Sequence, residues 1–365
     1  MEPISVVKTS ALTLRQQAQE SRKQDEGFCL WKANDSFPCR GLASRMQLLQ
    51  LMLPDHKITL RTRLGFIGLG YLGSRIARRL ATAGFPMVVY DLDRKKAVEL
   101  ADLGSEVEQH PGKLTSKVDV VLSCLPDERA VQSAYLGTGN VLDSARPGTR
   151  VIELSTISPE ASRQLNRAAR QFDVSALDVA VSGSTSSAEA GALTLFGGGD
   201  RELFETAEVV FSAIAKQWFY MGPSGSGVAM KLVVNALLGV GMQAIAEAVA
   251  LGTSLDLPRE LLFDTLAKTA VVAPAHLGKL ASAKKQDYAP QFPVRLMRKD
   301  FQLILDAATQ LGLSMPTTEA AAGINSAEAE SGIEEDFSAV VRRMERAAEV
   351  ERGYAAGGLG KGRSL

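Results

Sequence analysis

The chain has 365 residues, of which 41 are basic and 41 acidic, so its formal net charge at pH 7 is zero. This length predicts two domains with sizeable cores, and the balanced charge argues against a nucleic-acid or anionic-membrane partner. The three cysteines, Cys29, Cys39 and Cys124, are too few for a disulfide framework. None of them has metal-ligand spacing with a histidine, so we expect no metal site and a reducing, cytoplasmic location.

The first 62 residues differ from the rest because they mix charged and apolar residues without a steady period. Charged residues break up the first apolar stretch, which argues against a secretory signal. Early acidic residues argue against an organelle transit peptide, although organelle targeting stays open as the less favoured alternative. We therefore expect residues 1–62 to form a loosely ordered extension.

A glycine-rich turn follows the short apolar run of residues 64–67. Gly68, Gly70 and Gly73 form a G-x-G-x-x-G pattern, and residues 71–80 continue with helical periodicity. In a strand-to-helix turn the three glycines allow a tight turn, close approach of a pyrophosphate and close helix–sheet packing. The sequence therefore predicts a dinucleotide site. The residues expected to bind the cofactor there are Gly68, Leu69, Gly70, Tyr71, Leu72 and Gly73.

Asp91 closes the next apolar run, residues 85–90, about 20 residues after the glycines. An acid at this position accepts a hydrogen bond from a ribose 2′-hydroxyl and repels a 2′-phosphate, which favours NAD. The alternative is a helix cap, but Asp93 suits that role better. Arg94 and Lys95 keep NADP open as the less favoured cofactor.

Two further apolar runs, residues 118–126 and 149–154, predict buried strands whose ends lie at the ligand-binding edge of the sheet. Leu125 and Pro126 end the first, and Thr156 follows the second, so all three are expected to face the cofactor. Ser158 and Pro159 indicate the N-cap and first residue of a helix. Cys124 is interpreted as a small core residue.

A serine-rich loop follows another strand, predicted at residues 174–180. Ser182, Gly183 and Ser184 offer hydroxyl and backbone N–H groups to an anion. A flexible connector is the open alternative. Further strands are expected at 192–196 and 217–221, around a helix at 201–215, and the glycine-rich stretch 222–227 is expected to be the domain junction.

Residues 228–251 predict a long apolar helix that carries Lys231 and Asn235 on one face. Its length raises the possibility of a membrane span, but the polar residues favour a helix buried between domains. Desolvation of Lys231 would suit acid/base chemistry, and a lysine that snorkels to solvent is the alternative. His276 is interpreted as structural or surface-exposed.

These motifs together resemble the β-hydroxyacid dehydrogenase family, which includes 3-hydroxyisobutyrate dehydrogenase and semialdehyde reductases. Matching segments occur in the family's order over residues 64–345. They are Gly65 to Gly73, Ser155-Thr156, Asp178 to Ser184, Gly225 to Asn235, Lys299-Asp300-Phe301 and Asp336-Phe337-Ser338-Ala339.

The resemblance implies a role for each matched residue. Lys231 would be the catalytic acid/base, Asn235 a substrate ligand, and Thr156 and Lys299 cofactor contacts. Ser182 and Gly183 would bind the substrate carboxylate. Two positions depart from the family pattern, Ser184 in place of glycine and Val234 in place of asparagine, and both bear on which substrate is used.

The predicted fold is α/β, with a Rossmann-like NAD(P)-binding domain at residues 63–222 and an all-helical domain at 223–352 for substrate binding and oligomerisation. Residues 353–365 are expected to be a flexible tail. The expected activity is NAD(P)-dependent interconversion of a small 3-hydroxy acid and its semialdehyde, in a homodimer or homotetramer. An imine reductase on the same scaffold and a non-catalytic nucleotide-binding module are the alternatives, and the presence of Lys231 argues against both.

Overall fold

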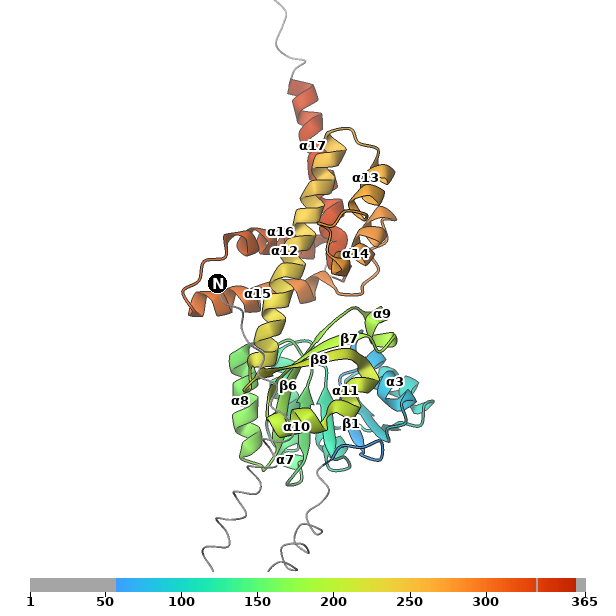
Figure 1. Cartoon of the computed structure of the whole chain (residues 1–365), viewed down its shortest axis with the longest axis vertical. Coiled ribbons are helices and arrows are strands. Elements are labelled where there is room, and N and C mark those ends of the chain that lie inside the picture. Colours follow the sequence, from blue (N-terminus) through green and yellow to red (C-terminus); the bar gives the residue numbers. More distant parts are fainter. Residues whose placement is uncertain (1–56, 333, 359–365) are drawn as a thin grey trace, which may run out of the picture. The chain divides into compact units, whose positions relative to one another are not determined.

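An eight-stranded sheet forms the first domain of the computed structural model, which describes residues 57–332 and 334–358 (Figure 1). The strand order is β3-β2-β1-β4-β5-β6-β7-β8. The strands from β3 to β6 are parallel, β7 is antiparallel to β6, and β8 is parallel to β7. The strands are β1 Leu64–Ile67, β2 Met87–Tyr90, β3 Glu106–Val107, β4 Val120–Ser123, β5 Arg150–Glu153, β6 Ser175–Ser182, β7 Leu193–Gly199 and β8 Ala215–Gly222.

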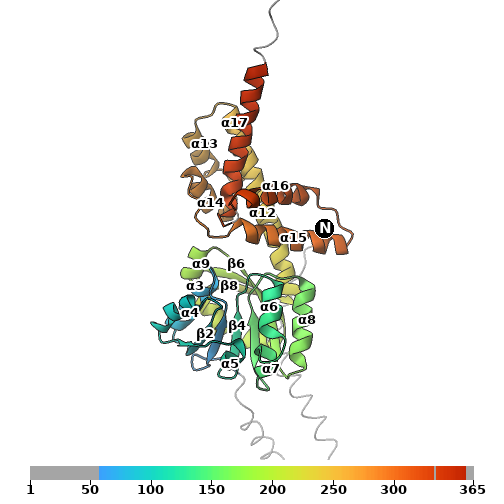
Figure 2. The same ribbon diagram turned by 180° about the vertical axis from the view of Figure 1, so that it is seen from behind.

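Helices cover both faces of the central part of the sheet, which explains why the strands β1, β2 and β4 are almost continuously apolar. Leu64 and Phe66 of β1 belong to the core on one face, whereas Ile67 belongs to the core on the other. Figures 1 and 2 show the two faces from opposite sides. The helices of this domain are α3 Gly73–Thr82, α4 Arg94–Ala101, α5 Pro111–Thr115, α6 Glu128–Tyr135, α7 Val141–Ser144, α8 Pro159–Arg170, α9 Thr185–Glu189, α10 Arg201–Thr206 and α11 Glu208–Ile214.

The α/β fold and all seven predicted strands are confirmed, with their ends shifted by a few residues. The two-residue edge strand β3 was not predicted because so short a strand leaves little pattern. The single helix predicted at 201–215 is wrong in detail: it is divided at Ala207 into α10 and α11, and Ala215 already belongs to β8. Ser158 caps α8 as predicted, since its Oγ accepts a hydrogen bond from Ala161 N–H.

The 29-residue helix α12, Ser226–Ser254, connects the sheet to the helical domain. Its first turn is held by Asp178 of β6, whose carboxylate accepts hydrogen bonds from Gly225 N–H (2.8 Å) and Val228 N–H (3.0 Å). Gly227 must be a glycine because a Cβ there would lie 2.3 Å from the Phe196 carbonyl oxygen. Asp178 and Gly227, which belong to two separate motifs, thus together form the junction between the sheet and α12.

The remaining helices pack around the distal part of α12 and share a second hydrophobic core with it. One of them, α14, was not predicted, although Pro274 at its first turn is a recognised start signal. These elements are α13 Arg259–Leu266, α14 Pro274–Lys284, α15 Val294–Gln310, α16 Pro316–Gly332, the 3₁₀ helix η2 Phe337–Ala339 and α17 Val340–Gly358.

By length and composition α12 could cross a membrane, and 39% of its most apolar window is buried inside the protein. The helix contacts β6, β7 and the helices α15, α16 and α17. The core helix of a globular protein passes the same test of length and composition, and these contacts favour that interpretation of α12.

The ends of the chain differ partly from the predicted boundaries. Residues 57–62, predicted to belong to the extension, form a turn before β1, and Ile58 is buried in the core. At the other end α17 continues to Gly358, so the tail predicted from residue 353 begins as helix. The rest of the predicted extension, residues 1–56, and residues 359–365 lie outside the described residues.

Candidate active site

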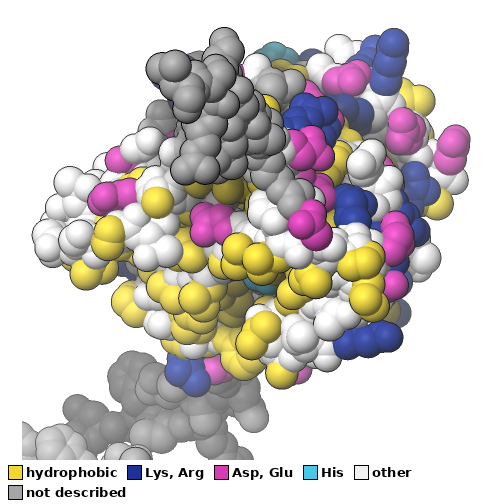
Figure 3. All heavy atoms as spheres, turned by 90° about the horizontal axis from the view of Figure 1, so that it is seen from above, with side chains coloured by type: hydrophobic (Ala, Val, Ile, Leu, Met, Phe, Trp, Pro, Cys, Tyr) yellow, Lys and Arg dark blue, Asp and Glu magenta, His cyan; other side chains and the backbone are white. Residues whose placement is uncertain are grey.

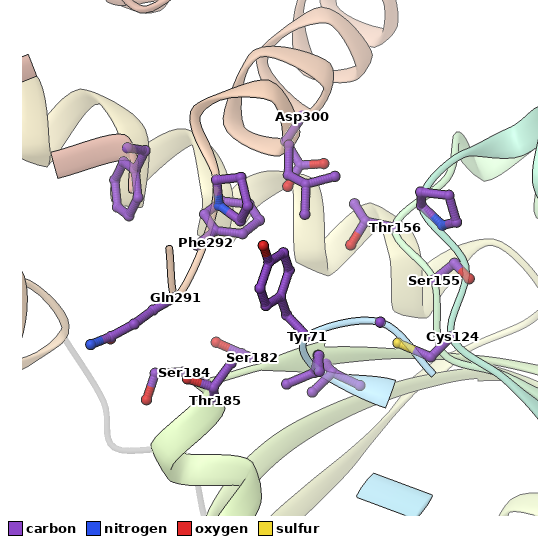
Figure 4. Close-up of a pocket in the computed structure, with 18 of the residues that line it drawn as sticks. Tyr71, Cys124, Ser155, Thr156, Ser182, Ser184, Thr185, Gln291, Phe292 and Asp300 are labelled. Carbon is purple, nitrogen blue, oxygen red and sulfur yellow. The ribbon is translucent and has the colours of Figure 1, made fainter. Parts of the chain in front are cut away.

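A cavity of about 1590 Å³ lies between the carboxyl edge of the sheet and the helical domain. The glycine loop, the strand-end loops and the serine-rich loop line it from the sheet side, and α12, α14 and α15 line it from the helical side. In Figure 4 the side chain of Tyr71 rises into this space, with Ser155 and Thr156 on one side and Ser182 and Ser184 below. Residues from both domains therefore share one cavity.

The glycine loop has the shape that a pyrophosphate needs. Gly68 has a positive φ of 93°, and a Cβ there would lie 2.4 Å from the Cys124 carbonyl oxygen. A Cβ on Gly73 would lie 2.1 Å from the Gly68 carbonyl oxygen, so this glycine allows the close packing of α3. Gly70 has nothing within 4 Å of that position among the described residues, which leaves room for a ligand against its backbone. The start of α3 lies at this opening, where helix N–H groups favour an anion.

Asp91 is fixed by two backbone groups. Its Oδ2 accepts a hydrogen bond from Leu69 N–H at 2.6 Å, and its Oδ1 accepts one from Asp93 N–H at 2.8 Å. The helix cap of α4 is Asp93, as the sequence predicted, because its side chain accepts from Lys95 N–H. Asp91 lines the cavity, and its remaining lone pairs are able to accept a hydrogen bond from a ribose hydroxyl.

The loops after β4 and β5 are joined at the cavity floor. Leu125 N–H donates to Ser155 Oγ at 2.7 Å. The Thr156 carbonyl accepts a hydrogen bond from Lys299 Nζ at 2.5 Å, which connects this floor to α15 of the helical domain. Lys299 is thus bound to the protein itself at the place where the resemblance expects a cofactor contact.

The serine-rich loop forms a defined turn held by hydrogen bonds within the loop. This disfavours the alternative that it is only a flexible connector. Gly183 has a positive φ of 141°, and a Cβ there would lie 2.8 Å from the Leu193 side chain. Ser184 caps α9, with its Oγ accepting from Ser187 N–H. The extra hydroxyl at this position is therefore used within the loop, while Ser182 and Gly183 stay at the cavity surface.

Lys231 projects into the cavity from the second turn of α12. It makes no hydrogen bond or ion pair with the residues that the structure describes. Burial lowers the pKa of its ammonium group to about 8, with Lys299 adding to the lowering and Asp300 opposing it. A lysine with this pKa exchanges its proton readily near neutral pH, as an acid/base group must.

Asn235 lies behind the cavity wall and is fully buried. Its Nδ2 donates to Asp300 Oδ2 at 2.5 Å, and Lys299 Nζ lies 3.0 Å from Asp300 Oδ1. Asp300 itself lines the cavity. Asn235 therefore contacts the site through Asp300, so its predicted role as a substrate ligand has no direct geometric support.

Most of the residues predicted for the site are brought together. Only Leu69 and Asn235 are outside the cavity lining. Each donates a hydrogen bond to an acidic residue that does line the cavity, Leu69 to Asp91 and Asn235 to Asp300. The predicted residues that line the cavity are Gly68, Gly70, Tyr71, Leu72, Gly73, Asp91, Leu125, Pro126, Thr156, Ser182, Gly183, Ser184, Lys231 and Lys299.

Gln291 and Phe292 form a wall of the cavity for which the sequence patterns predict no role. Asp336 holds this wall, because its Oδ2 accepts from Phe292 N–H (3.0 Å), Gln291 N–H (3.2 Å) and Lys279 Nζ (2.5 Å). The sequence patterns include Asp336 only as part of a segment that matches the family. An acidic residue directly before an apolar turn is a typical helix N-cap, and this signal could have revealed Asp336. In the structure Asp336 caps η2, because its side chain accepts a hydrogen bond from Ser338 N–H.

His276 and Cys124 also reach the cavity but have structural surroundings. The His276 ring is buried, and its Nε2 lies 2.9 Å from the Leu238 carbonyl oxygen of α12. Burial raises the pKa of the Cys124 thiol to about 12. Cys124 is therefore a neutral thiol at physiological pH, in agreement with its interpretation as a small core residue.

Comparison with protein families gives two matches that together cover most of the described chain. Residues 63–222 match the NAD-binding domain of 6-phosphogluconate dehydrogenase, and residues 225–344 match the NAD-binding domain of NADP-dependent 3-hydroxyisobutyrate dehydrogenase. The glycine loop, Asp91 and Lys231 thus belong to an NAD(P)-dependent oxidoreductase. More narrowly, the chain belongs to the β-hydroxyacid dehydrogenase family.

Individual relatives support this membership. Glyoxylate/succinic semialdehyde reductase 1 of Arabidopsis thaliana is 32% identical over 281 residues, which are 77% of this chain and 97% of the relative. The solved structure of 3-hydroxyisobutyrate dehydrogenase from Mycobacterium tuberculosis with L-serine is 31% identical, with a TM-score of 0.69. The match covers 78% of this chain and 99% of that one.

Imine reductases share the fold at greater distance. An imine reductase from a Pseudomonas species is 17% identical, with a TM-score of 0.53, over 78% of this chain and 99% of its own. At that identity the likeness concerns the fold alone.

Proposed function

We propose that this protein interconverts a small 3-hydroxy acid and its semialdehyde, with Lys231 as the general acid/base. The observation that carries the proposal is the position of Lys231. It is a desolvated lysine without a protein partner among the described residues, and it shares a cavity with the glycine loop. The relatives support a small substrate, because their names refer to glyoxylate, succinic semialdehyde and 3-hydroxyisobutyrate.

The two sides of the cavity have different roles in the proposed reaction. A bound nicotinamide cofactor supplies or accepts the hydride. In the reducing direction Lys231 donates its proton to the carbonyl oxygen, where negative charge develops, and in the oxidising direction it removes the hydroxyl proton. Ser182 and Gly183 offer a hydroxyl and a backbone N–H to the substrate carboxylate, which aligns the reacting carbon.

The substrate is identified by a panel assayed in both directions. Glyoxylate and succinic semialdehyde are tested with NADH and NADPH, and 3-hydroxyisobutyrate and L-serine with NAD and NADP. We expect turnover of at least one aldehyde–alcohol pair. Turnover of a cyclic imine alone would instead support the imine reductase alternative, and cofactor binding without any turnover would support the nucleotide-binding module.

The preferred cofactor in this proposal is NAD, because Asp91 presents its carboxylate where a 2′-phosphate would lie. We also propose a homodimer or homotetramer, supported by exposed apolar residues on α12. The cytoplasmic location stays a prediction.

A further inference from the structure

A carboxyl group is buried beneath the cavity floor, at the end of β5. Glu153 is only 1% exposed, and the two residues before it in the strand, Val151 and Ile152, are buried and apolar. Burying an ionisable group in a sheet is costly unless hydrogen bonds compensate. The hydrogen bonds of Glu153 therefore indicate its role.

Glu153 uses one oxygen to connect two loops. Its Oε1 accepts hydrogen bonds from Ser155 N–H (2.9 Å), from Ser155 Oγ–H and from Ser123 Oγ–H (3.2 Å). Because Ser155 gives its own proton to Glu153, its Oγ is free to accept Leu125 N–H at 2.7 Å. The carboxyl thus fixes both the loop after β4 and the loop after β5.

These two loops form one side of the cavity. Leu125, Ser155 and Thr156 all line it, and Figure 4 shows Ser155 and Thr156 beside Cys124. The Thr156 carbonyl also accepts the hydrogen bond of Lys299, so a shift of this loop would reach the helical domain that carries Lys231. A displacement of 1 Å at such a surface is enough to disturb a reaction geometry.

We propose that Glu153 is a positioning residue that holds the Leu125 and Ser155–Thr156 loops in the conformation that binds the nicotinamide cofactor. The proposal rests on the cofactor site described above. It assigns Glu153 no contact with cofactor or substrate, only control of the loops that make this contact.

The charge state of Glu153 gives the proposal a measurable signature. Burial raises the pKa of its carboxyl to about 7, partly offset by the hydrogen bonds from Ser155 and Ser123. Glu153 Oε2 is buried and has no hydrogen-bond partner among the described residues, which also disfavours ionisation.

The ionisable groups that interact with Glu153 are Asp178 of β6, Tyr135 of α6 and Cys124 after β4. Burial raises the pKa values of Tyr135 and Cys124, so both are neutral over the range in which Glu153 titrates. Tyr135 hydroxyl lies 2.7 Å from Ser123 Oγ, which extends the network away from the cavity. Hydrogen bonds to an ionised carboxylate are stronger than those to a neutral carboxyl, so the network should weaken as pH falls through about 7.

The test is the dissociation constant of NADH, measured by fluorescence titration without substrate from about pH 8 to about pH 6. Loss of a charge-assisted hydrogen bond should weaken NADH binding by about fivefold over this range in the wild-type protein. Glu153→Gln keeps an oxygen acceptor but does not titrate, so its binding should be independent of pH. Ser155→Ala, which breaks the connection to Leu125, should weaken binding about fivefold or more at both pH values.

Hydrogen–deuterium exchange of the cofactor-free protein provides a second readout. Peptides containing Leu125 should exchange faster in Ser155→Ala, and in the wild type at low pH after correction for intrinsic exchange. Ser212→Ala is the matched control, because Ser212 is an exposed residue of α11 whose Oγ donates an ordinary hydrogen bond to the Val209 carbonyl. It should change neither readout.

Two results would overturn the proposal. One is a Glu153→Gln protein that keeps the wild-type pH dependence of NADH binding. The other is a pair of Glu153 and Ser155 variants that unfold at lower temperature but bind NADH with wild-type affinity. Because binding is measured without substrate, a failed substrate panel would not affect either result.

Discussion

Asp91 combines a structural and a selective role in one side chain. Its two oxygens accept backbone hydrogen bonds from Leu69 and Asp93, so the carboxylate cannot turn away from the cavity without loss of these bonds. A 2′-phosphate beside it would set like charges together, and we expect this to reduce kcat/KM with NADP(H) by at least about tenfold relative to NAD(H).

Measurement of kcat/KM with both cofactors tests this prediction. Asp91→Asn removes the negative charge, so the difference between kcat/KM with NAD(H) and with NADP(H) should become smaller. Glu99→Gln, which changes an exposed acid on α4 outside the cavity lining, is the control. Equal or better kcat/KM with NADP(H) in the wild type would show that Asp91 does not select the cofactor.

Lys231 gives a pH dependence whose sign differs between the two directions. Its pKa is lowered to about 8, first by burial. Oxidation needs the neutral amine as a base, so kcat/KM for the hydroxy acid should rise as pH increases through about 8. Reduction needs the ammonium as an acid, so kcat/KM for the semialdehyde should fall over the same range.

Asp300→Asn gives a further check of this assignment, because Asp300 raises the pKa of Lys231. Its removal should shift both pH profiles toward lower pH. Profiles that do not move in this variant would mean that the titrating group is not Lys231.

The parts of the site that could be predicted from the sequence are those whose residues lie close together in the chain. The glycine loop and Asp91 follow from short-range patterns, and Lys231 was found from its helix and its motif. Glu153, Asp336 and the indirect position of Asn235 depend on contacts between distant segments, such as the hydrogen bond of Asn235 to Asp300. Patterns within one element do not reveal such pairings, although an acid in the apolar strand of Glu153 was a visible signal.

At the scale of elements, Asp336 joins η2 to α14 and to the wall of Gln291 and Phe292. The Lys279–Asp336 ion pair is almost fully buried, so removal of one partner leaves a charge without compensation. We expect Asp336→Ala to lower the free energy of unfolding by about 3–5 kcal/mol.

Denaturant titration measures this change in the free energy of unfolding. Glu205→Ala is the control, because its pair with Arg201 is exposed and should contribute less than about 1 kcal/mol. An Asp336→Ala protein within about 1 kcal/mol of the wild type would contradict the role of Asp336 as the anchor of this wall.

The α12 helix shows what sequence patterns predict well at this scale. Its length and apolar character were evident, but its precise start depends on Asp178 and Gly227, which meet only in the folded chain. The helix α14 was not predicted, although Pro274 stands in its first turn, where proline is favoured.

At the scale of the whole molecule, α12 carries an apolar stripe that the described chain leaves exposed. Val233 is 57% exposed, Leu237 73% and Leu251 62%. Val233 and Leu251 are about five helical turns apart, so they lie on the same side of the helix. Figure 3, which is turned to look from above the view of Figure 1, shows exposed apolar side chains gathered at one side of the molecule.

We expect this stripe to lie in a contact between copies of the chain, because exposed apolar stripes of this kind mark interaction sites. Val233→Glu with Leu251→Glu should convert an oligomer to monomers in light scattering after size exclusion. Leu311→Glu, at an exposed position beyond α15, is the control and should not change the mass. A wild-type protein that is monomeric at assay concentrations would contradict this prediction.

The most direct measurement of the central claim is kcat of Lys231→Ala together with its affinity for NADH. We predict that kcat falls by about 100- to 10,000-fold, while the NADH dissociation constant stays within about threefold of the wild type. Lys285→Ala, an exposed lysine after α14, should leave both values unchanged. A Lys231→Ala protein that keeps more than about a tenth of wild-type kcat, or that loses NADH binding instead, would contradict the assignment of Lys231 as the acid/base group.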